Sequence, residues 1–212
     1  MRIGLLGGSF NPAHSGHRSI SLAALNALDL DEVWWMVSPG NPLKEGASDM
    51  APFQARFGSA VKMARHAPIR VTAIERRLGT RFTVDTVDKL THLYPKKRFI
   101  WLMGSDNLAQ FHHWRGWRRI AGHVPIAVIA RPGYEKLARA APAMGWLRRF
   151  VHPAYHAQDW TRWRLPALVL LRFRPDDTSA TRLRRVDPAW QNRFLDASLA
   201  PDPNGAVHAP SR

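Results

Sequence analysis

Short apolar runs alternate with longer segments of helical periodicity over most of the chain. The apolar runs predict buried strands, at residues 3–6, 33–37, 69–73, 98–103, 125–130 and 168–171. Apolar positions spaced three or four residues apart predict helices between them, at residues 15–28, 52–66, 83–94, 106–110, 114–121, 134–141 and 181–186. Alternating strands and helices are typical of an α/β protein with a doubly wound, mostly parallel sheet and helices on both faces. We therefore expect that fold class.

The pattern continues without a break that would separate two domains. We expect a single domain over residues 1–197. From about residue 198 onward proline, glycine, alanine and serine dominate, and this composition predicts a disordered tail at 198–212. A chain of 212 residues, 45% of them hydrophobic, is long enough to bury a substantial core.

Cysteine usage and the N-terminus indicate the compartment. The chain has no cysteine, which excludes disulfides and thiolate metal sites. Arg2 is followed by only a few apolar residues before Gly7, too few for the hydrophobic region of a signal peptide. No apolar stretch approaches the roughly 18 residues of a membrane span. We expect a soluble, cytoplasmic protein that does not associate with membranes.

The chain is strongly basic, because 31 Lys and Arg residues outnumber 16 Asp and Glu residues and give a net charge of +15. Such a charge attracts polyanions, which leaves two interpretations. One is a nucleic-acid-binding module, and the other is an enzyme for small phosphorylated substrates. The basic residues form no long helical stripe interleaved with aromatic residues, the pattern typical of a surface that binds single strands. The charge alone does not decide between the two.

Glycines and histidines follow the first predicted strand, in the stretch GLLGGSFNPAHSGH at residues 4–17. Gly7 and Gly8 let an anion approach the backbone N–H groups closely, and the start of the next helix adds unpaired N–H donors. His14 and His17 are three residues apart, so on one helical turn both can donate to the same phosphate. The stretch has neither the Gly-Lys-Ser/Thr of a Walker A loop nor the G-x-G-x-x-G of dinucleotide-binding dehydrogenases. The alternative is a tight turn with two solvated histidines.

The stretch GGSFNPAHSGH resembles the signature of the nucleotidyltransferases with an (H/T)xGH motif, here HSGH at residues 14–17. Within that superfamily, further segments resemble the nicotinate mononucleotide adenylyltransferases, in the family's order: SPGNPLK, RRLGTRFTVDTVDKL, MGSDNLAQFHHW, VIARPG and DDTSATRLR. The resemblance spans residues 2–186. It implies a Rossmann-like fold and the reaction of ATP with nicotinate mononucleotide to give nicotinate adenine dinucleotide and pyrophosphate, a step of NAD biosynthesis. It also implies Mg²⁺, which accompanies ATP.

The resemblance also implies roles for individual residues. Four are implied to be catalytic, namely His14, His17, Lys44 and Arg184. ATP contacts are implied for Gly8, Ser9, Phe10, His14, His17, Gly104, Asp106, Ser179, Thr181 and Arg184. Contacts to nicotinate mononucleotide are implied for Ser9, Lys44, Thr83, Asp106, Trp114 and Arg131. In this scheme Trp114 stacks on the pyridine ring and Thr83 lies at the nicotinate carboxylate, and no metal site held by the protein itself is expected.

The chemistry of this reaction suits these residue types. The acceptor phosphate is itself the nucleophile that attacks the α-phosphorus of ATP, so catalysis can rest on positioning and charge neutralisation. Imidazoles, a lysine, an arginine and backbone N–H groups supply that neutralisation. The helix that starts near Thr83 favours an anionic carboxylate, so we expect the acid form of the mononucleotide to be preferred over the amide form.

The chain departs from the family pattern at three places. The family has a second serine in the C-terminal phosphate motif where this chain has Ala180, which removes one hydroxyl donor. The loop has Leu43 before Lys44 where the family has a histidine. The family's usual ending is not found after Val186, which leaves open the stability and oligomer contacts made there.

Several features also have other interpretations. Without the resemblance, Trp114 is a core residue and Asp106 is a helix cap. Histidine pairs within 112–113 and 152–156 have spacings that allow metal ligation, but no clear third ligand accompanies them. Phosphopantetheine adenylyltransferase, of the same superfamily, is the alternative enzyme, and the nucleic-acid-binding module is the alternative class. We expect ATP and nicotinate mononucleotide as partners and no nucleic acid, and the sequence leaves a homo-oligomer open.

Overall fold

The computed structural model describes residues 1–40, 50–130, 135–173 and 179–195. Its strands are β1 (Arg2–Gly8), β2 (Glu32–Val37), β3 (Ile69–Thr72), β4 (Arg98–Gly104), β5 (Ile126–Ala130), β6 (Val151–His152) and β7 (Leu168–Arg172). Its α-helices are α1 (Ser15–Ala27), α2 (Phe53–Ala64), α3 (Ile74–Leu78), α4 (Thr83–Leu93), α5 (Ser105–Gln110), α6 (Trp117–His123), α7 (Glu135–Ala140), α8 (Pro142–Leu147) and α9 (Ala180–Val186). Short 3-10 helices are η2 (Phe111–His113), η3 (Arg148–Phe150), η4 (Ala154–Arg162) and η5 (Trp190–Phe194).

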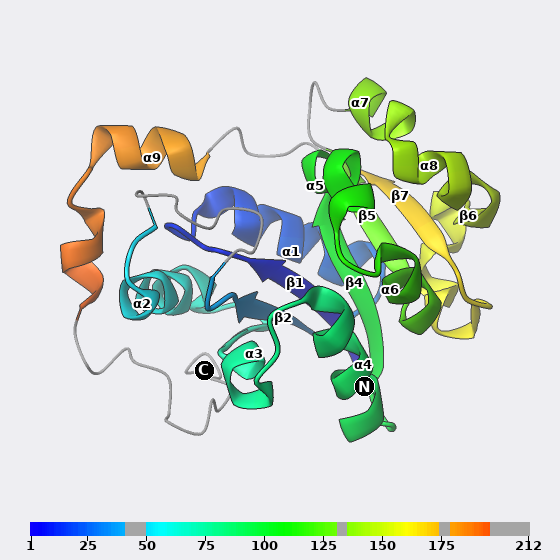
Figure 1. Cartoon of the computed structure of the whole chain (residues 1–212), viewed down its shortest axis with the longest axis horizontal. Helices are drawn as coiled ribbons and strands as arrows, with labels where there is room; N and C mark the ends of the chain where they lie inside the picture. Colours follow the sequence, from blue (N-terminus) through cyan, green and yellow to red (C-terminus); the bar gives the residue numbers. More distant parts are fainter. Residues whose placement is uncertain (41–49, 131–134, 174–178, 196–212) are drawn as a thin grey trace.

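The described strands form one seven-stranded sheet in the order β3-β2-β1-β4-β5-β7-β6, and every pairing is parallel. The chain starts in the middle at β1, moves outward through β2 to β3, and returns to β4 on the other side of β1 (Figure 1). The carboxyl ends of β1 and β4 therefore form the switch point, where ligands bind in sheets of this kind. The predicted doubly wound fold is confirmed, and all six predicted strands are present.

Helices cover both faces of the sheet. On one face α1, α2 and η4 pack against a cluster that includes Trp35, and on the other face α4, α5, α6 and α8 pack against a cluster that includes Trp34. Because β1 and β2 are covered on both faces, their sequences are nearly continuous apolar runs instead of alternating ones. No described helix has the length and apolar character needed to cross a bilayer.

The structure adds elements that the periodicity does not predict, namely α3, α8, β6 and the 3-10 helices. Helices of five or six residues span less than two turns, so too few apolar positions repeat for a period to show. The nine-residue η4 instead buries a single large anchor, Trp160, whose Nε1–H donates to the carbonyl of Leu28 at 2.9 Å. Such elements depend on tertiary contacts.

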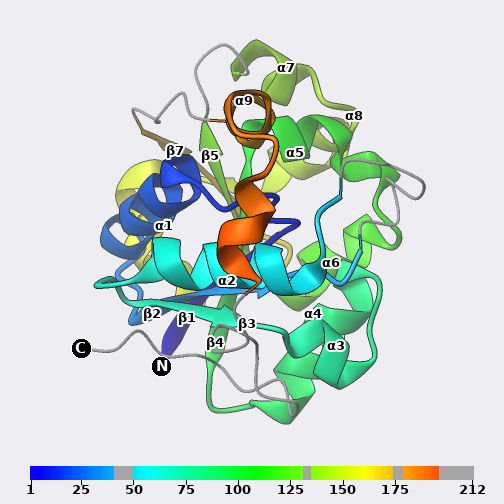
Figure 2. The same cartoon turned by 90° about the vertical axis from the view of Figure 1, so that its left-hand side faces the viewer.

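The last described segment packs back onto α2. Trp190 of η5 is 4% exposed and packs in a small cluster with Ala55. The side-chain amide of Gln54 donates to the carbonyl of Leu195 at 3.1 Å. Figure 2 shows this segment, in orange, crossing in front of α2. After α9, where the family has its usual ending, this chain therefore has a segment that packs on α2. The predicted tail at 198–212 lies outside the described residues.

Candidate active site

A cavity of about 510 Å³, the main cavity, opens where β1 and β4 end. Its walls come from the ends of β1, β2 and β4, from α1 and α5, from the segment between α3 and α4, and from the segment after η2. Among the residues predicted for the site, it is lined by Gly8, Ser9, His17, Thr83, Gly104, Asp106 and Trp114. Residues that are far apart in the sequence therefore meet at the switch point of the sheet.

Packing fixes the loop between β1 and α1. Phe10 adopts a φ of 48°, and its buried ring stacks on Trp35 with 5.0 Å between ring centroids. A positive φ is unfavourable for a residue with a side chain, so this contact must hold the loop in place. At Gly7 an added Cβ would lie 2.9 Å from the ring of Trp101, which leaves room for glycine alone. Phe10 supports the loop from the core, while Gly8 and Ser9 line the main cavity.

The two histidines of the motif lie at the start of α1. His14 is the N-cap, and its backbone N–H donates to Nδ1 of His17 at 3.2 Å. Because Nδ1 of His17 accepts a hydrogen bond, we assign the proton of its neutral ring to Nε2. His17 lines the main cavity, so this N–H can donate to an anion there. His14 is only 3% exposed, and its ring lies 3.9 Å from that of His17.

A buried arginine connects this loop to the end of β2. The guanidinium of Arg56 on α2 donates to four backbone carbonyls, those of Ser9 at 2.7 Å, Ser38 at 2.8 Å, Pro39 at 3.3 Å and Ala51 at 3.0 Å. Only arginine presents five N–H groups in a rigid planar fork that can serve so many acceptors. Burial lowers the pKa of Arg56 to about 10, so the group remains charged at neutral pH. Since Ser9 and Ser38 line the main cavity, Arg56 fixes two of its walls.

Another part of the main cavity is aromatic. The half-buried ring of Trp114 packs edge-on against Trp101, with centroids 6.0 Å apart, and against Phe111 at 5.4 Å. Trp114 thus belongs both to the edge of the core and to the cavity wall. Phe82 and Thr83, at the start of α4, line the same cavity. An aromatic wall beside a helix N-terminus suits a flat ring that carries an anionic group.

The end of β4 contributes a glycine and a carboxylate. Gly104 is the last residue of β4 and the N-cap of α5, and Asp106 lies in the first turn of that helix. The alternative that Asp106 is the N-cap is therefore wrong. Both residues line the main cavity.

Arg184 brings α9 to the loop after β1. Its Nη1 donates to the carbonyl of Asn11 at 2.7 Å, across 173 positions of sequence. Ser179 is the N-cap of α9, and its hydroxyl accepts the N–H of Arg182 at 3.2 Å. Thr181 lies exposed in the first turn. The predicted C-terminal phosphate motif thus contacts the predicted N-terminal one.

Two predicted site residues, Lys44 and Arg131, lie outside the described residues. Within the described part of the chain, no group of three or more His, Cys, Asp or Glu side chains could hold a metal ion. The described carboxylates that line the main cavity are those of Glu75 and Asp106.

The main cavity also contains residues that sequence reasoning missed, namely Ser38, Glu75, Arg81, Phe82, His113 and Arg115. Arg81, Phe82, His113 and Arg115 lie within two residues of the predicted Thr83 or Trp114, and this proximity in sequence was the signal that could have found them. Ser38 begins the segment SPGNPLK, whereas Glu75 lies outside the segments that resemble the family. Arg81 and Arg115 add positive charge to the cavity wall, which suits anionic substrates.

Glu75 on α3 is a buried acid. Its side chain is 7% exposed, and its Oε1 accepts a hydrogen bond from the hydroxyl of Thr86 at 3.4 Å. The hydroxyls of Thr86 and Thr80 are 2.8 Å apart and complete a short chain of polar groups. Burial raises the pKa of Glu75 to about 7, against a partial lowering by Thr86.

This raised pKa makes the stability depend on pH. Glu75 keeps its proton in the folded protein up to about pH 7 but loses it near 4.5 when unfolded. The stabilisation is complete below pH 4.5 and is lost as the pH rises through 7, by about 3 kcal/mol in total. We expect urea unfolding of Glu75→Gln to show a decline in stability that is smaller by about this amount over the same range.

The control for that experiment is Asp29→Asn, which removes an exposed carboxylate that pairs with Arg2. It should leave the decline of the wild-type protein unchanged. Equal declines in wild type and Glu75→Gln would contradict the raised pKa.

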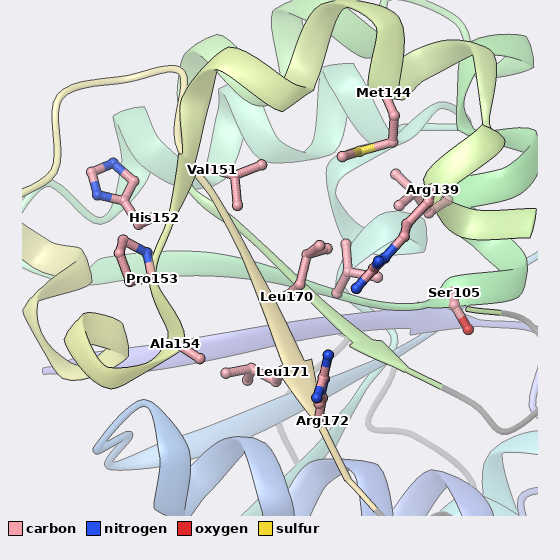
Figure 3. Close-up of a pocket in the computed structure, with 12 residues that line it drawn as sticks. Ser105, Arg139, Met144, Val151, His152, Pro153, Ala154, Leu170, Leu171 and Arg172 are labelled. Carbon is pink, nitrogen blue, oxygen red and sulfur yellow. The ribbon is translucent and has the colours of Figure 1, made fainter. Parts of the chain in front are cut away.

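A second cavity, of about 250 Å³, lies beside β7. Figure 3 shows Met144 and Leu170 among the apolar residues of its wall, together with the side chains of Arg139 and Arg172. None of the described residues predicted for the site lines it. The main cavity is therefore the candidate active site.

Comparisons with known proteins show the family of the chain. Residues 5–186 match the cytidylyltransferase-like family, and the chain belongs to that family of nucleotidyltransferases. The "probable nicotinate-nucleotide adenylyltransferase" of Erythrobacter litoralis is 61% identical over 199 residues, which cover 94% of this chain and 90% of that protein. The protein of the same description from Parvibaculum lavamentivorans is 51% identical over 184 residues, 87% of this chain and 91% of its own. Within the family, the chain belongs to the group of the nicotinate-nucleotide adenylyltransferases.

Solved structures agree in fold. Plasmodium falciparum nicotinic acid mononucleotide adenylyltransferase complexed with NaAD superposes with a TM-score of 0.61 and 15% identity, over 93% of this chain and 92% of that one. The same enzyme complexed with APC gives a TM-score of 0.61 and 16% identity, over 87% and 82%. At this level of identity the likeness supports the Rossmann-like α/β fold.

Proposed function

We propose that this enzyme transfers the AMP part of ATP to nicotinate mononucleotide, giving nicotinate adenine dinucleotide and pyrophosphate in NAD biosynthesis. One observation carries the proposal. The glycine-rich loop and His17, which suit phosphates, share one cavity with Thr83 and Trp114, which suit a pyridine carboxylate. Its volume of about 510 Å³ lies in the range of small-molecule sites. The family and the relatives described above support the same reaction.

The reaction is an in-line displacement at the α-phosphorus of ATP. The phosphate of nicotinate mononucleotide forms the new P–O bond, the bond to the bridging oxygen breaks, and pyrophosphate leaves with the electron pair. The phosphate is already ionised near neutral pH, so no protein nucleophile or strong base is needed. The protein positions the two nucleotides and neutralises the charge that moves onto pyrophosphate.

We assign the charge neutralisation to His17 and its neighbours. The Nε2–H of His17 donates to phosphate oxygens, and His14 maintains the geometry of the helix start. Arg184 is held beside the loop through Asn11 and adds a positive charge there. Lys44 is proposed as a fourth catalytic residue on the strength of the sequence resemblance.

The two nucleotides take different parts of the site. For ATP we propose contacts from Gly8, Ser9, Phe10, His14, His17, Gly104, Asp106, Ser179, Thr181 and Arg184, with Phe10 acting through its backbone because its ring is buried. For nicotinate mononucleotide we propose contacts from Ser9, Lys44, Thr83, Asp106, Trp114 and Arg131. Ser9 and Asp106 line the main cavity and serve both nucleotides in this scheme.

We propose that Mg²⁺ reaches the site as part of the ATP complex. Mg²⁺ is commonly held by one or two carboxylates together with substrate phosphates and water. Asp106 in the first turn of α5 offers such a carboxylate at the main cavity. The ion supplies charge neutralisation on the phosphates when it is bound.

The test is pyrophosphate release on mixing the protein with ATP and nicotinate mononucleotide. We expect release with this acceptor and none with phosphopantetheine, the acceptor of the alternative enzyme. Salt-sensitive binding of oligonucleotides without pyrophosphate release would instead favour the nucleic-acid-binding module. The net charge of +15 is consistent with the proposed enzyme, because it steers polyanionic ATP toward the protein.

Replacing Trp114 by alanine should weaken binding of the mononucleotide. Loss of one aromatic stacking contact, about 0.5–1.5 kcal/mol, corresponds to an increase in its KM of about two- to tenfold, with little change in the KM for ATP. Initial rates with each substrate varied in turn measure both constants. Trp114→Phe keeps a flat ring and should recover most of the affinity, and an equal rise in both KM values would contradict the assignment.

Three further statements from the sequence remain proposals. We propose a single domain over residues 1–197 and a cytoplasmic location, and we leave the oligomeric state open. Size-exclusion chromatography with light scattering measures the oligomeric state directly. Limited proteolysis tests whether residues 1–197 form a single unit.

A further inference from the structure

Glu75 lies in the wall of the main cavity together with the residues proposed for the pyridine ring. It is buried, and it lines the same space as Thr83 and Trp114. The hydroxyl of Thr86 donates to it, and its own backbone carbonyl accepts the N–H of Thr80 at 3.0 Å. The first contact holds the carboxyl group in the cavity wall, and the second holds the backbone that carries it. The proposed reaction does not use it.

The surroundings of Glu75 favour its uncharged form. The main elements packed on α3 are β2 and α4, and Arg76 of α3 also lies over the ring of Phe53 on α2, 4.7 Å from its centroid. From α4 the group that reaches Glu75 is the neutral hydroxyl of Thr86. The charged residue of β2, Glu32, is engaged with Arg70 and with Nε1 of Trp34. The described titratable groups that share the main cavity with Glu75 are those of His17, Arg81, Asp106, His113 and Arg115. Burial raises the pKa of Glu75 to about 7, and the hydrogen bond from Thr86 lowers it only in part.

We propose that Glu75 is a specificity-determining residue: its own charge decides whether the part of the main cavity lined by Thr83 and Trp114 accepts an anionic ring substituent. This inference rests on the proposed function. With Glu75 uncharged, the cavity admits a mononucleotide whose ring carries an anionic carboxylate. With Glu75 ionised, two like charges share a partly desolvated space, and the anionic substrate is disfavoured. An amide substituent carries no charge, so it does not meet this repulsion.

The test compares two acceptors that differ only in that substituent. The ratio of kcat/KM for nicotinate mononucleotide to kcat/KM for nicotinamide mononucleotide is measured from pH 6 to pH 9. Titrations common to both reactions, of ATP, the acceptor phosphate and the histidines, cancel in this ratio. We expect the wild-type ratio to fall by about tenfold or more as the pH rises through 7. A ratio that does not change with pH would overturn the proposal.

Two variants make the assignment specific to Glu75. Glu75→Gln keeps the size and hydrogen-bonding capacity of the side chain but cannot ionise, so its ratio should stay constant with pH. Thr86→Val removes the hydrogen bond that lowers the pKa of Glu75, so the midpoint of the fall should move to higher pH. A Glu75→Gln ratio that falls in parallel with wild type would assign the effect to another group and overturn the proposal.

A measurement on the wild-type protein keeps the proposal testable if a variant does not fold. Binding of an anion beside Glu75 favours its protonated form, so the complex should take up a proton near pH 7.5. Calorimetry of nicotinate mononucleotide binding in two buffers of different ionisation enthalpy counts that proton. Equal proton uptake with nicotinamide mononucleotide would overturn the inference.

Failure of the inference and failure of the proposed function give different results. If the proposed function is wrong, neither mononucleotide yields pyrophosphate in the wild-type protein. If only the inference is wrong, both mononucleotides yield pyrophosphate, and the ratio of their kcat/KM values does not depend on the ionisation of Glu75.

Discussion

Replacing His17 by asparagine is expected to lower kcat about 10²–10³-fold while leaving the fold intact. The side-chain oxygen of asparagine can take the place of Nδ1 and accept the N–H of His14, which maintains the start of α1. Asparagine has no donor at the place of Nε2, so the phosphates lose a hydrogen bond as charge develops on the leaving pyrophosphate. Initial rates of pyrophosphate release and thermal unfolding measure the two effects separately.

The matched control is His17→Gln. Glutamine at this third helical position can accept the N–H of His14 through Oε1, and its amide N–H lies near the position of Nε2. We expect it to keep the helix start and to retain more activity than the asparagine variant. Full turnover in a folded His17→Asn protein would remove His17 from the catalytic residues.

The first βα unit could be predicted because its signals are local. The apolar run of β1, the glycines and the two histidines lie within 17 residues, and their spacing alone places them at a strand end and a helix start. The structure confirms these positions. The same local signals predict a mostly parallel sheet, but they do not predict the order of its strands.

Contacts between distant segments needed the family resemblance or the structure. Arg184 and the carbonyl of Asn11 are separated by 173 positions, and neither residue type suggests the other. The resemblance predicted that Arg184 belongs to the site, and the structure brings it to the loop. Trp114 is similar, since composition alone assigns a tryptophan to the core and only the structure shows that it also lines the main cavity.

Arg56 and Glu75 could not be predicted from the pattern of polar positions. A charged residue in a short helix is normally interpreted as solvent-facing. Both side chains are buried here because their partners are groups with no sequence signature, namely loop carbonyls for Arg56 and threonine hydroxyls for Glu75. The sequence identifies the segments that meet at the site but not the buried charges that hold or tune it.

Replacing Arg56 by alanine is expected to destabilise the protein by about 3 kcal/mol or more. The change removes the hydrogen-bond donor of four backbone carbonyls. Three of them, those of Ser9, Ser38 and Pro39, belong to loops that border the main cavity. Buried carbonyls without a partner are costly, and the cavity left by the side chain adds to the loss. Urea unfolding monitored by tryptophan fluorescence measures the change.

Arg18→Ala is the matched control. The guanidinium of Arg18 also donates to two backbone carbonyls, those of Met63 at 2.9 Å and Arg65 at 2.8 Å, but the residue is only partly buried. Water can replace it at these carbonyls, so we expect a loss of about 1 kcal/mol. Equal losses in the two variants would mean that burial of Arg56 adds nothing to its effect.

Arg56→Lys separates the charge of Arg56 from its geometry. Lysine keeps the positive charge, but a single ammonium group cannot reach all four carbonyls that are arranged around the edge of the guanidinium. The loops that carry Ser9 and Ser38 should therefore shift while the helix remains folded. A displacement of about 1 Å at a reacting group can lower the rate about 10²-fold, so kcat should fall far more than stability. If Arg56→Lys retains kcat, charge alone is sufficient; if kcat falls in a stable protein, the four hydrogen bonds position the phosphate loop for the reaction.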